Sequence, residues 1–213
     1  MILCYDFTKS AAVLQAGKGT DMEKIIGSVQ QKIQALLEEK ESILIAIDGS
    51  CTSGKSTLAE ALAGRLDCNV LHMDDFFLRP EQRTPQRLAQ TGGNMDYERF
   101  WEEVLQPLKE GKVFSYRPYD CAAGMLKEPV SVIPKAVTIV EGTYSQHPYF
   151  GDVYDWKLFL TVSPEIRENR ILQRPVFLQR RFFTEWIPME QTYFREFRIR
   201  EQADSVLLPE DNQ

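Results

Sequence analysis

The sequence predicts an α/β fold of three layers, in which helices cover both faces of a parallel sheet. Two observations predict it. Apolar runs at residues 43–47, 68–73, 137–142 and 156–162 have the length of buried strands. Segments with helical spacing of apolar residues alternate with these runs, and that alternation is typical of a parallel sheet with crossover helices. A chain of 213 residues is long enough to bury one sizeable core.

A phosphate-binding motif connects the first strand to a helix. Gly49, four further residues and then Gly54-Lys55-Ser56 match the pattern G-x-x-x-x-G-K-[ST] in full. Glycines let the backbone N–H groups of such a loop face inward, and the helix formers at 58–63 predict a helix N-terminus, which itself binds anions. The motif predicts a P-loop NTPase fold that binds ATP, and the alternative is a chance loop. The predicted ATP contacts are Gly49, Ser50, Cys51, Thr52, Ser53, Gly54, Lys55, Ser56 and Thr57.

Composition narrows the classes of partner. A net charge of −6 argues against bulk binding to nucleic acid or to an anionic membrane. The four cysteines form no C-x-x-C pair, so they indicate neither a zinc site nor a disulfide framework. No apolar run approaches the roughly 18 residues of a membrane span, and Asp6 stands where a signal peptide would be basic. We therefore expect a cytoplasmic protein.

The N-terminal part divides into two segments. Residues 1–21 are an extension of unclear role, and residues 22–213 are expected to form a single domain. Core packing is the expected use of the first helix of that domain, and a partner-binding helix is the alternative. Its apolar stripe consists of Ile25, Ile26, Val29, Ile33, Leu36 and Leu37.

Acidic residues follow the second strand. Asp74 and Asp75 stand at its C-terminal end, where α/β proteins bind ligands, although a turn rich in aspartate is the alternative. Residues 79–94 are rich in proline, glutamine, arginine and glycine and predict a loop. Asp96 then stands at the start of a helix that ends at Gly111, so it is also a candidate N-cap.

The middle of the chain predicts a small hairpin and a metal ligand. Residues 113–120 and 130–133 are the expected arms of the hairpin. The third strand of the sheet then ends in Glu141, the position of the carboxylate that supports Mg²⁺ in phosphate-loop enzymes. Ser56 is the second predicted metal ligand, through its hydroxyl. A capped strand end is the alternative reading of Glu141.

The C-terminal part carries a row of arginines. Pro164 is expected to start a helix on which Arg167, Arg170 and Arg174 share one face, so we predict a lid at about 164–182 that closes on phosphates. A solvated face is the alternative. Residues 182–197 predict an aromatic helix interrupted near Pro188, and residues 205–208 predict a final strand.

The order of these motifs resembles the uridine kinase and nicotinamide riboside kinase group of phosphate-loop kinases. The resemblance covers roughly residues 42–200 and is strongest to bacterial uridine kinase-like proteins. It is carried by the phosphate loop, His72-Met-Asp-Asp-Phe-Phe77, Gly92-Gly-Asn-Met-Asp-Tyr97, Tyr116-Arg-Pro-Tyr-Asp120, the Val-Glu-Gly end at 140–142 and the arginine helix.

The resemblance implies a role for each matched residue. Asp74 corresponds to the catalytic base, Glu141 to the acid that assists the metal, and Asp96 to the acid that binds ribose hydroxyls. Lys55 and the lid arginines Arg167, Arg170 and Arg174 would neutralise charge on the phosphates. Tyr119 lies in the base-recognition hairpin, where uridine–cytidine kinases have Tyr-Asp-Phe and then a histidine. This chain instead has Tyr119-Asp120-Cys121-Ala122 and no histidine nearby, so the acceptor stays open.

The expected function is transfer of the γ-phosphoryl group of ATP, with Mg²⁺, to a hydroxyl of a small molecule. The 5′-OH of a nucleoside is the first acceptor to consider, and nicotinamide riboside, pantothenate or a sugar phosphate are the alternatives. A nucleotide-dependent switch or ATPase is an alternative of another class. An idle nucleotide-binding module is disfavoured because Lys55, Ser56, Asp74 and Glu141 are all present. A homo-oligomer is compatible with this expectation.

Overall fold

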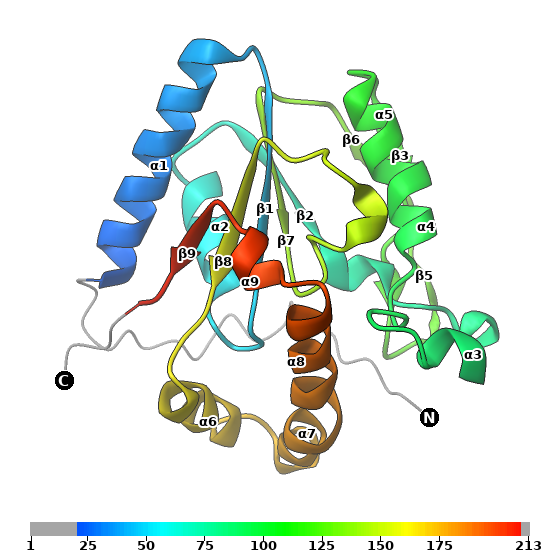
Figure 1. The fold of residues 1–213 in the computed structure, drawn as a ribbon. Coiled ribbons are helices and arrows are strands. Elements are labelled where there is room, and N and C mark those ends of the chain that lie inside the picture. The colour runs from blue at the N-terminus through cyan, green and yellow to red at the C-terminus, as the bar shows by residue number, and fades with distance from the viewer. Residues whose placement is uncertain (1–20, 210–213) are drawn as a thin grey trace.

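A five-stranded parallel sheet forms the middle of the molecule in the computed structural model, which describes residues 21–209 (Figure 1). The predicted extension at 1–21 lies outside the described residues, apart from Asp21. In spatial order the strands are β2 (Cys68–His72), β7 (Val137–Glu141), β1 (Ile43–Gly49), β8 (Trp156–Leu160) and β9 (Ser205–Leu207). The predicted strands, including the final one, are thus confirmed.

β1 is the central strand. It pairs with β7 in the register Ile43 to Val137 and with β8 in the register Ile45 to Trp156. All its residues are buried, which explains why its sequence is a continuous apolar run rather than an alternating one. Because side chains alternate along a strand, Asp48 points to the same face of the sheet as Leu44 and Ala46.

One face of the sheet is covered by α1 (Asp21–Glu39) and α2 (Lys55–Ala63). The buried residues Ile26, Val29 and Ile33 of α1 belong to the same apolar cluster as Leu58 and Leu62 of α2 and the strands beneath them. The apolar stripe predicted from Met22 onward therefore packs on the core, and this confirms the expected use of the helix.

The opposite face is covered by a helical segment from the middle of the chain and by helix α8 (Ile187–Glu196). The segment consists of α4 (Tyr97–Phe100), a π-helical turn at Trp101–Leu105 and α5 (Gln106–Lys109). Phe100, Phe150 and Tyr193 are among the residues buried on this side. Helices thus cover both faces, and the predicted three-layer arrangement is confirmed.

Two π-helical turns stand directly before a proline. A proline lacks an N–H and its ring crowds the carbonyl four residues earlier. In the first case Gln106, the residue before Pro107, donates its N–H to Trp101 O, five residues back. In the second case Ile187, before Pro188, donates to Phe182 O. The predicted interruption near Pro188 is therefore a local widening of one continuous helical run, and not a break.

A small hairpin projects beside the sheet. β3 (Phe114–Tyr116) pairs with β6 (Val130–Val132), and β4 (Tyr119–Asp120) pairs with β5 (Met125–Leu126), both antiparallel. The predicted hairpin is confirmed, but its first arm is split into two short strands at Pro118, which cannot donate to a ladder.

The segment 79–94 is more ordered than the prediction of a loop. It holds a 3₁₀ turn, η3 (Pro80–Gln82), and one turn of helix, α3 (Pro85–Leu88). Each begins with a proline, whose fixed φ suits a first helical position. Thr84 caps α3 by accepting a hydrogen bond from Arg87 N at 3.1 Å. The prolines were thus helix starts rather than loop markers.

The predicted lid segment lies past the carboxyl ends of the strands, at the bottom of Figure 1. It consists of α6 (Pro164–Leu172), α7 (Val176–Arg181) and the π-helical turn Phe182–Trp186. Ile171, Leu178, Phe182 and Ile187 form an apolar cluster of their own, separate from the two large ones, with Cys51 packed against it. This segment therefore rests on the phosphate loop. The remaining short helices are η2 (Met73–Phe76), η5 (Pro148–Phe150) and α9 (Ile199–Gln202).

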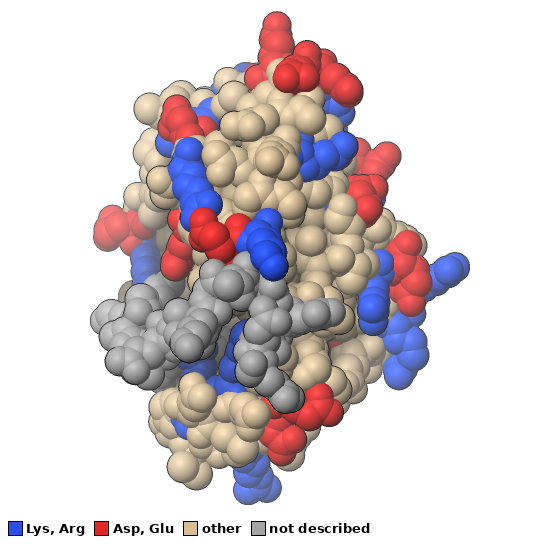
Figure 2. All heavy atoms as spheres, turned by 90° about the vertical axis from the view of Figure 1, so that its left-hand side faces the viewer, with Lys and Arg blue, Asp and Glu red and all other residues tan. Residues whose placement is uncertain are grey.

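The surface on the α1 side carries charges of both signs. Figure 2 shows Lys and Arg side chains interspersed with Asp and Glu side chains over this face. Within residues 21–209, no helix is both long enough and apolar enough to cross a membrane.

Candidate active site

The phosphate loop is fixed by a close approach of two strands. Gly49 has φ of 139°, and a Cβ built on it would lie 1.9 Å from the backbone oxygen of Leu160 on β8. No other residue fits there without moving backbone. Ser50 N donates to the same oxygen at 3.2 Å, so the start of the loop is tied to β8. Thr52 and Gly54 also have positive φ, which turns the chain into α2.

The loop presents polar groups that suit a phosphate. Gly54 precedes the N-terminus of the nine-residue helix α2, where backbone N–H groups and the helix dipole favour an anion. The hydroxyl oxygens of Thr52 and Ser53 are buried, and neither has a hydrogen-bond partner among the described residues. Buried hydroxyls of this kind are costly unless a ligand satisfies them. The loop therefore fits the phosphates of a nucleotide.

Lys55 contributes a buried ammonium group to the loop. Its Nζ donates to Gly49 O at 2.9 Å and to Ser50 O at 2.8 Å. These contacts hold the positive charge against the first part of the loop, beside the anion site, and rotation of the flexible side chain can exchange a carbonyl oxygen for a phosphate oxygen.

Oxygen donors suited to Mg²⁺ meet where β1 and β7 end. Ser56 Oγ donates to Glu141 Oε1 at 3.1 Å, and the same oxygen is 2.7 Å from His72 Nδ1. The hydrogen bond to Glu141 raises the pKa of His72. Mg²⁺ prefers oxygen ligands and in kinases takes few protein ligands together with phosphates and water. Ser56 and Glu141 fit such a site, and no part of residues 21–209 holds a cluster of three or more acidic, histidine or cysteine ligands.

Asp74 and Asp75 follow β2 but differ in their surroundings. The Asp74 carboxyl is accessible to solvent, yet enough protein surrounds it that desolvation, with the negative charge of Glu141, raises its pKa to about 6. Asp75 accepts a hydrogen bond from Tyr116 Oη at 3.2 Å, and its backbone oxygen accepts one from Arg99 Nη2 at 2.8 Å. Asp74 thus lies on the side of Lys55 and Glu141, whereas Asp75 is tied to the hairpin.

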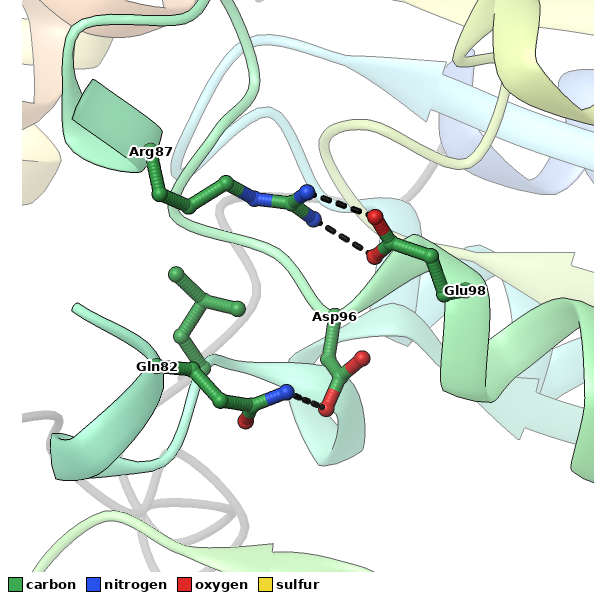
Figure 3. Close-up of a pocket in the computed structure, with 5 residues that line it drawn as sticks. Gln82, Arg87, Asp96 and Glu98 are labelled. Carbon is green, nitrogen blue, oxygen red and sulfur yellow. Dashed lines mark hydrogen bonds and ion pairs between the residues drawn. The ribbon is translucent and has the colours of Figure 1, made fainter. Parts of the chain in front are cut away.

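Asp96 serves as a helix cap and also lines a pocket. Its carboxylate accepts a hydrogen bond from Arg99 N at 3.2 Å, as an N-cap of α4 does, and one from Gln82 Nε2 at 2.8 Å. The pocket has a volume of about 390 Å³. Figure 3 shows the Gln82–Asp96 hydrogen bond and the paired contacts between Arg87 and Glu98, each 2.6 Å, around it. Both readings of Asp96 made from the sequence are therefore compatible with its position.

Tyr119, the predicted hairpin contact, is not among the residues that line this pocket. Its side chain is buried in β4, and its hydroxyl accepts a hydrogen bond from Arg83 Nη2 at 3.4 Å. Arg83 also lies over the Tyr119 ring, 5.8 Å from its centroid. A direct contact between Tyr119 and an acceptor remains a prediction.

Two of the three lid arginines reach the phosphate loop region. Arg170 Nη1 donates to Thr52 O at 2.9 Å. Arg167 Nη1 lies 3.3 Å from Glu190 Oε1, and Glu190 Oε2 accepts the N–H of Cys51 at 2.8 Å. None of the contacts within residues 21–209 joins the Arg174 side chain to this loop. Arg170 thus contacts the loop directly and Arg167 is linked to it through Glu190, and the catalytic roles of all three arginines stay predictions.

Sequence reasoning missed three buried residues that support the loop. Asp48 Oδ2 accepts hydrogen bonds from Tyr193 Oη at 2.8 Å and from Gln146 N at 3.0 Å, and burial raises the pKa of Asp48 to about 6. An acid at the end of an apolar strand was a visible signal for Asp48. Glu190 and Tyr193 lie far along the chain in a helix without a motif, so no local pattern pointed to them.

These features define a class. A parallel sheet whose central strand ends in a phosphate loop that leads into a helix, with helices on both faces, is the arrangement of the P-loop NTPase fold. The solved structure of a possible uridine kinase from Bacillus stearothermophilus has this fold and matches with a TM-score of 0.61 at 19% identity, covering 84% of this chain and 99% of that one.

Sequence comparison also finds similar proteins, each of which is named as a kinase or as kinase-like. The chain is similar to a pantothenate kinase from Limosilactobacillus reuteri, with 27% identity over 152 residues, and to a uridine kinase from Clostridium botulinum, with 28% identity over 146 residues. It is also similar to the uridine-cytidine kinase-like 1 protein of Mus musculus, with 27% identity over 153 residues. No model of a protein family matches the sequence.

The matched regions cover different shares of these proteins. They take up 62%, 64% and 65% of this chain for the bacterial pantothenate kinase, the uridine kinase and the mouse protein. The match spans about half of the pantothenate kinase (48%), about a quarter of the mouse protein (27%) and 70% of the uridine kinase.

Proposed function

We propose that this chain is a kinase that transfers the γ-phosphoryl group of ATP to a hydroxyl of a small molecule, with the 5′-OH of a nucleoside as the first acceptor to test. One observation carries the proposal. A carboxyl group with a raised pKa, Asp74, lies at the end of the sheet that also carries the phosphate-loop residues Lys55 and Ser56. A switch or simple ATPase has no need of a base for an alcohol at this place.

Asp74 is the group that accepts the proton of the acceptor hydroxyl. A base works best when its pKa is near the working pH, because it is then ionised yet still attracts a proton in the transition state. Desolvation brings Asp74 toward that range. Asp75 is held by Tyr116 and is not needed for this step.

Positive groups on the other side of the site neutralise the charge of the phosphoryl group in transfer. Lys55 lies in the loop, and Arg167 and Arg170 approach it from α6. Bound Mg²⁺, held by Ser56 with support from Glu141, would supply further positive charge to the phosphate oxygens. The lid segment excludes water, which would otherwise compete with the acceptor.

The pocket at Asp96 is the proposed acceptor site. Its polar lining suits an acceptor with several hydroxyl groups, such as a ribose, and consists of Gln82, Arg87, Asp96 and Glu98. Pantothenate is a second candidate, because a pantothenate kinase is among the relatives. The switch alternative loses its main support, since the apolar stripe of α1 is buried in the core.

The deciding experiment is a screen of acceptors with ATP and Mg²⁺, read as ADP release. Nucleosides, nicotinamide riboside, pantothenate and sugar phosphates should be compared with a reaction without acceptor. We expect slow ADP release alone and strong stimulation by one class of acceptor. If the protein binds ATP normally but no acceptor stimulates ADP release, it is an ATPase or a switch instead. Within the proposal the protein is cytoplasmic, and its partners are small molecules rather than nucleic acid.

A further inference from the structure

The inference starts from a buried carboxylate that the proposed reaction does not use. Glu190 lies on α8 with only 3% of its surface exposed. One of its oxygens accepts the N–H of Cys51 at 2.8 Å, and the other lies 3.3 Å from Arg167 Nη1. A single side chain therefore joins α8, the phosphate loop and the arginine-bearing helix α6.

The charge of Glu190 calls for an explanation beyond packing. Burying a carboxylate is unfavourable unless charges or hydrogen bonds compensate it, and desolvation raises the pKa of Glu190. The Cys51 N–H and the positive charges of Lys55 and Arg167 act in the opposite direction. The compensation comes entirely from groups of the phosphate site, so the carboxylate is matched to that site and not to the helix that carries it.

The two arginines of α6 are held in different ways. Arg170 donates directly to the loop at Thr52 O, 2.9 Å away. Arg167 instead contacts Glu190, which engages Nη1. A guanidinium has five N–H donors in a rigid fork, so a carboxylate on one terminal nitrogen leaves the other for a phosphate oxygen. Fixing the fork in advance lowers the cost of ordering it when the phosphate arrives.

Helix α8, which carries Glu190, is itself held in a fixed position. Tyr193 lies three residues after Glu190, on the same side of the helix, and donates from its hydroxyl to Asp48 Oδ2 at 2.8 Å. Both Tyr193 and Asp48 are fully buried. Two polar contacts of one helix face thus lock α8 against the strand and loop that bind the nucleotide, and a side chain held in this way keeps its partner within a narrow range of positions.

We propose that Glu190 is a positioning residue that orients Arg167 toward the phosphoryl group in transfer. The inference rests on the proposed kinase function. A competing role is that Glu190 takes the place of a phosphate and hinders the nucleotide. The contact favours positioning, because Cys51 lies in the first part of the loop, before the helix N-terminus at Lys55 where the anion site is formed.

The test is a double-mutant cycle. Glu190→Gln keeps the shape of the side chain and removes its charge. We expect it to lower kcat by roughly tenfold, within the range for residues in contact, with a smaller change in KM for ATP. In an Arg167→Ala background the same change should have no further effect. In an Arg170→Ala background it should retain its full effect, because Arg170 is anchored without Glu190.

Two further variants exclude a general loss of structure. Glu196→Gln removes an exposed carboxylate of α8 itself, which accepts a hydrogen bond from the Thr91 hydroxyl, and should leave kcat unchanged. Glu190→Asp keeps the charge and should recover part of the rate lost in Glu190→Gln. Thermal melting of every variant shows whether it is folded. If Glu190→Gln does not fold, Glu190→Asp takes its place in the double-mutant cycle.

The outcomes separate the roles. Equal losses of kcat from Glu190→Gln in the wild-type and Arg167→Ala backgrounds would overturn the proposal in favour of a structural role. Tighter ATP binding by Glu190→Gln would overturn it in favour of a competitor. If the wild type transfers phosphate to no acceptor, the kinase proposal itself fails. In that case the double-mutant cycle is measured as the affinity of each variant for a non-hydrolysable ATP analogue, by calorimetry. Glu190 is still expected to couple to Arg167 and not to Arg170.

Discussion

Asp74 and Asp75 are neighbours in the chain, but their side chains have different surroundings and can therefore play different roles. The carboxylate of Asp75 is engaged by the Tyr116 hydroxyl, whereas that of Asp74 is accessible and carries a pKa of about 6. The resemblance to the kinase group implied that Asp74 is the base, and the different surroundings of the two carboxylates add a physical reason to prefer it within the pair.

We expect Asp74→Asn to lower kcat by roughly 10²–10⁴, the usual contribution of a positioned base, with little change in ATP affinity. Asp75→Asn is the matched control and should lose less. Steady-state kinetics with a responsive acceptor and calorimetry with ATP provide the two readings. A crippled Asp75 variant beside an active Asp74 variant would reverse the assignment.

The raised pKa of Asp74 also predicts a pH dependence. Desolvation by the surrounding protein and the negative charge of Glu141 favour the neutral form, so the group is protonated below about pH 6 and cannot accept a proton there. We expect kcat/KM to fall as pH decreases through about 6, and the fall should be absent from the residual activity of Asp74→Asn. A pH–rate profile from 5 to about 8 measures it. A flat profile across this range would assign proton transfer to another group.

At the scale of elements, α6 and α8 together form the positive side of the site. α6 supplies Arg167 and Arg170, and α8 supplies the carboxylate that holds Arg167. The lid segment has its own apolar cluster, which includes Ile171 and Phe182 and against which Cys51 of the phosphate loop packs.

We expect Arg170→Ala to lower kcat more than it raises KM for ATP, because the charge is needed most in the transition state. A single arginine directed at a transferring phosphoryl group contributes about 10³–10⁵ in rate, and we expect the lower end or less, since Arg167 shares the charge. Arg170→Lys should restore only part of the loss, because lysine lacks the planar fork. Unchanged kcat in the alanine variants of Arg167, Arg170 and Arg174 would mean a solvated face and no lid.

Most elements followed from the sequence because their signals are local. The four main strands, the first helix, the phosphate loop and the hairpin each have their own periodicity or turn residues. The two prolines at 107 and 188 were harder, because a proline within a helical pattern can break the helix or only widen it, and packing decides between them. The contact of Glu190 with the loop could not be predicted, since it joins residues far apart in the chain.

At the scale of the whole molecule, nucleotide binding should be visible as stability. A ligand at 100 times its dissociation constant adds about 2.7 kcal/mol to the free energy of unfolding. For a chain of this size each kcal/mol raises the melting temperature by about 2–4 °C. We expect such a shift with ATP and Mg²⁺, and a smaller one when a chelator removes the metal.

Lys55→Ala is the matched variant for that measurement. It should remain folded, lose most of the shift and lose phosphoryl transfer, because the ammonium group serves the phosphates rather than the core. Circular dichroism confirms folding. A variant that unfolds, or one that keeps the full shift and normal turnover, would remove Lys55 from the proposed role.

The place of β1 in the sheet has a consequence for how the molecule is made. Its hydrogen-bonding partners, β7 and β8, both come much later in the chain, in the registers Ile43 to Val137 and Ile45 to Trp156. Pairings between segments so distant in sequence form slowly, because a long loop must close before any contact compensates it. During synthesis the apolar strand that precedes the phosphate loop therefore waits without its two strand partners until most of the domain has left the ribosome. In that interval its unpaired strand edges are open to aggregation.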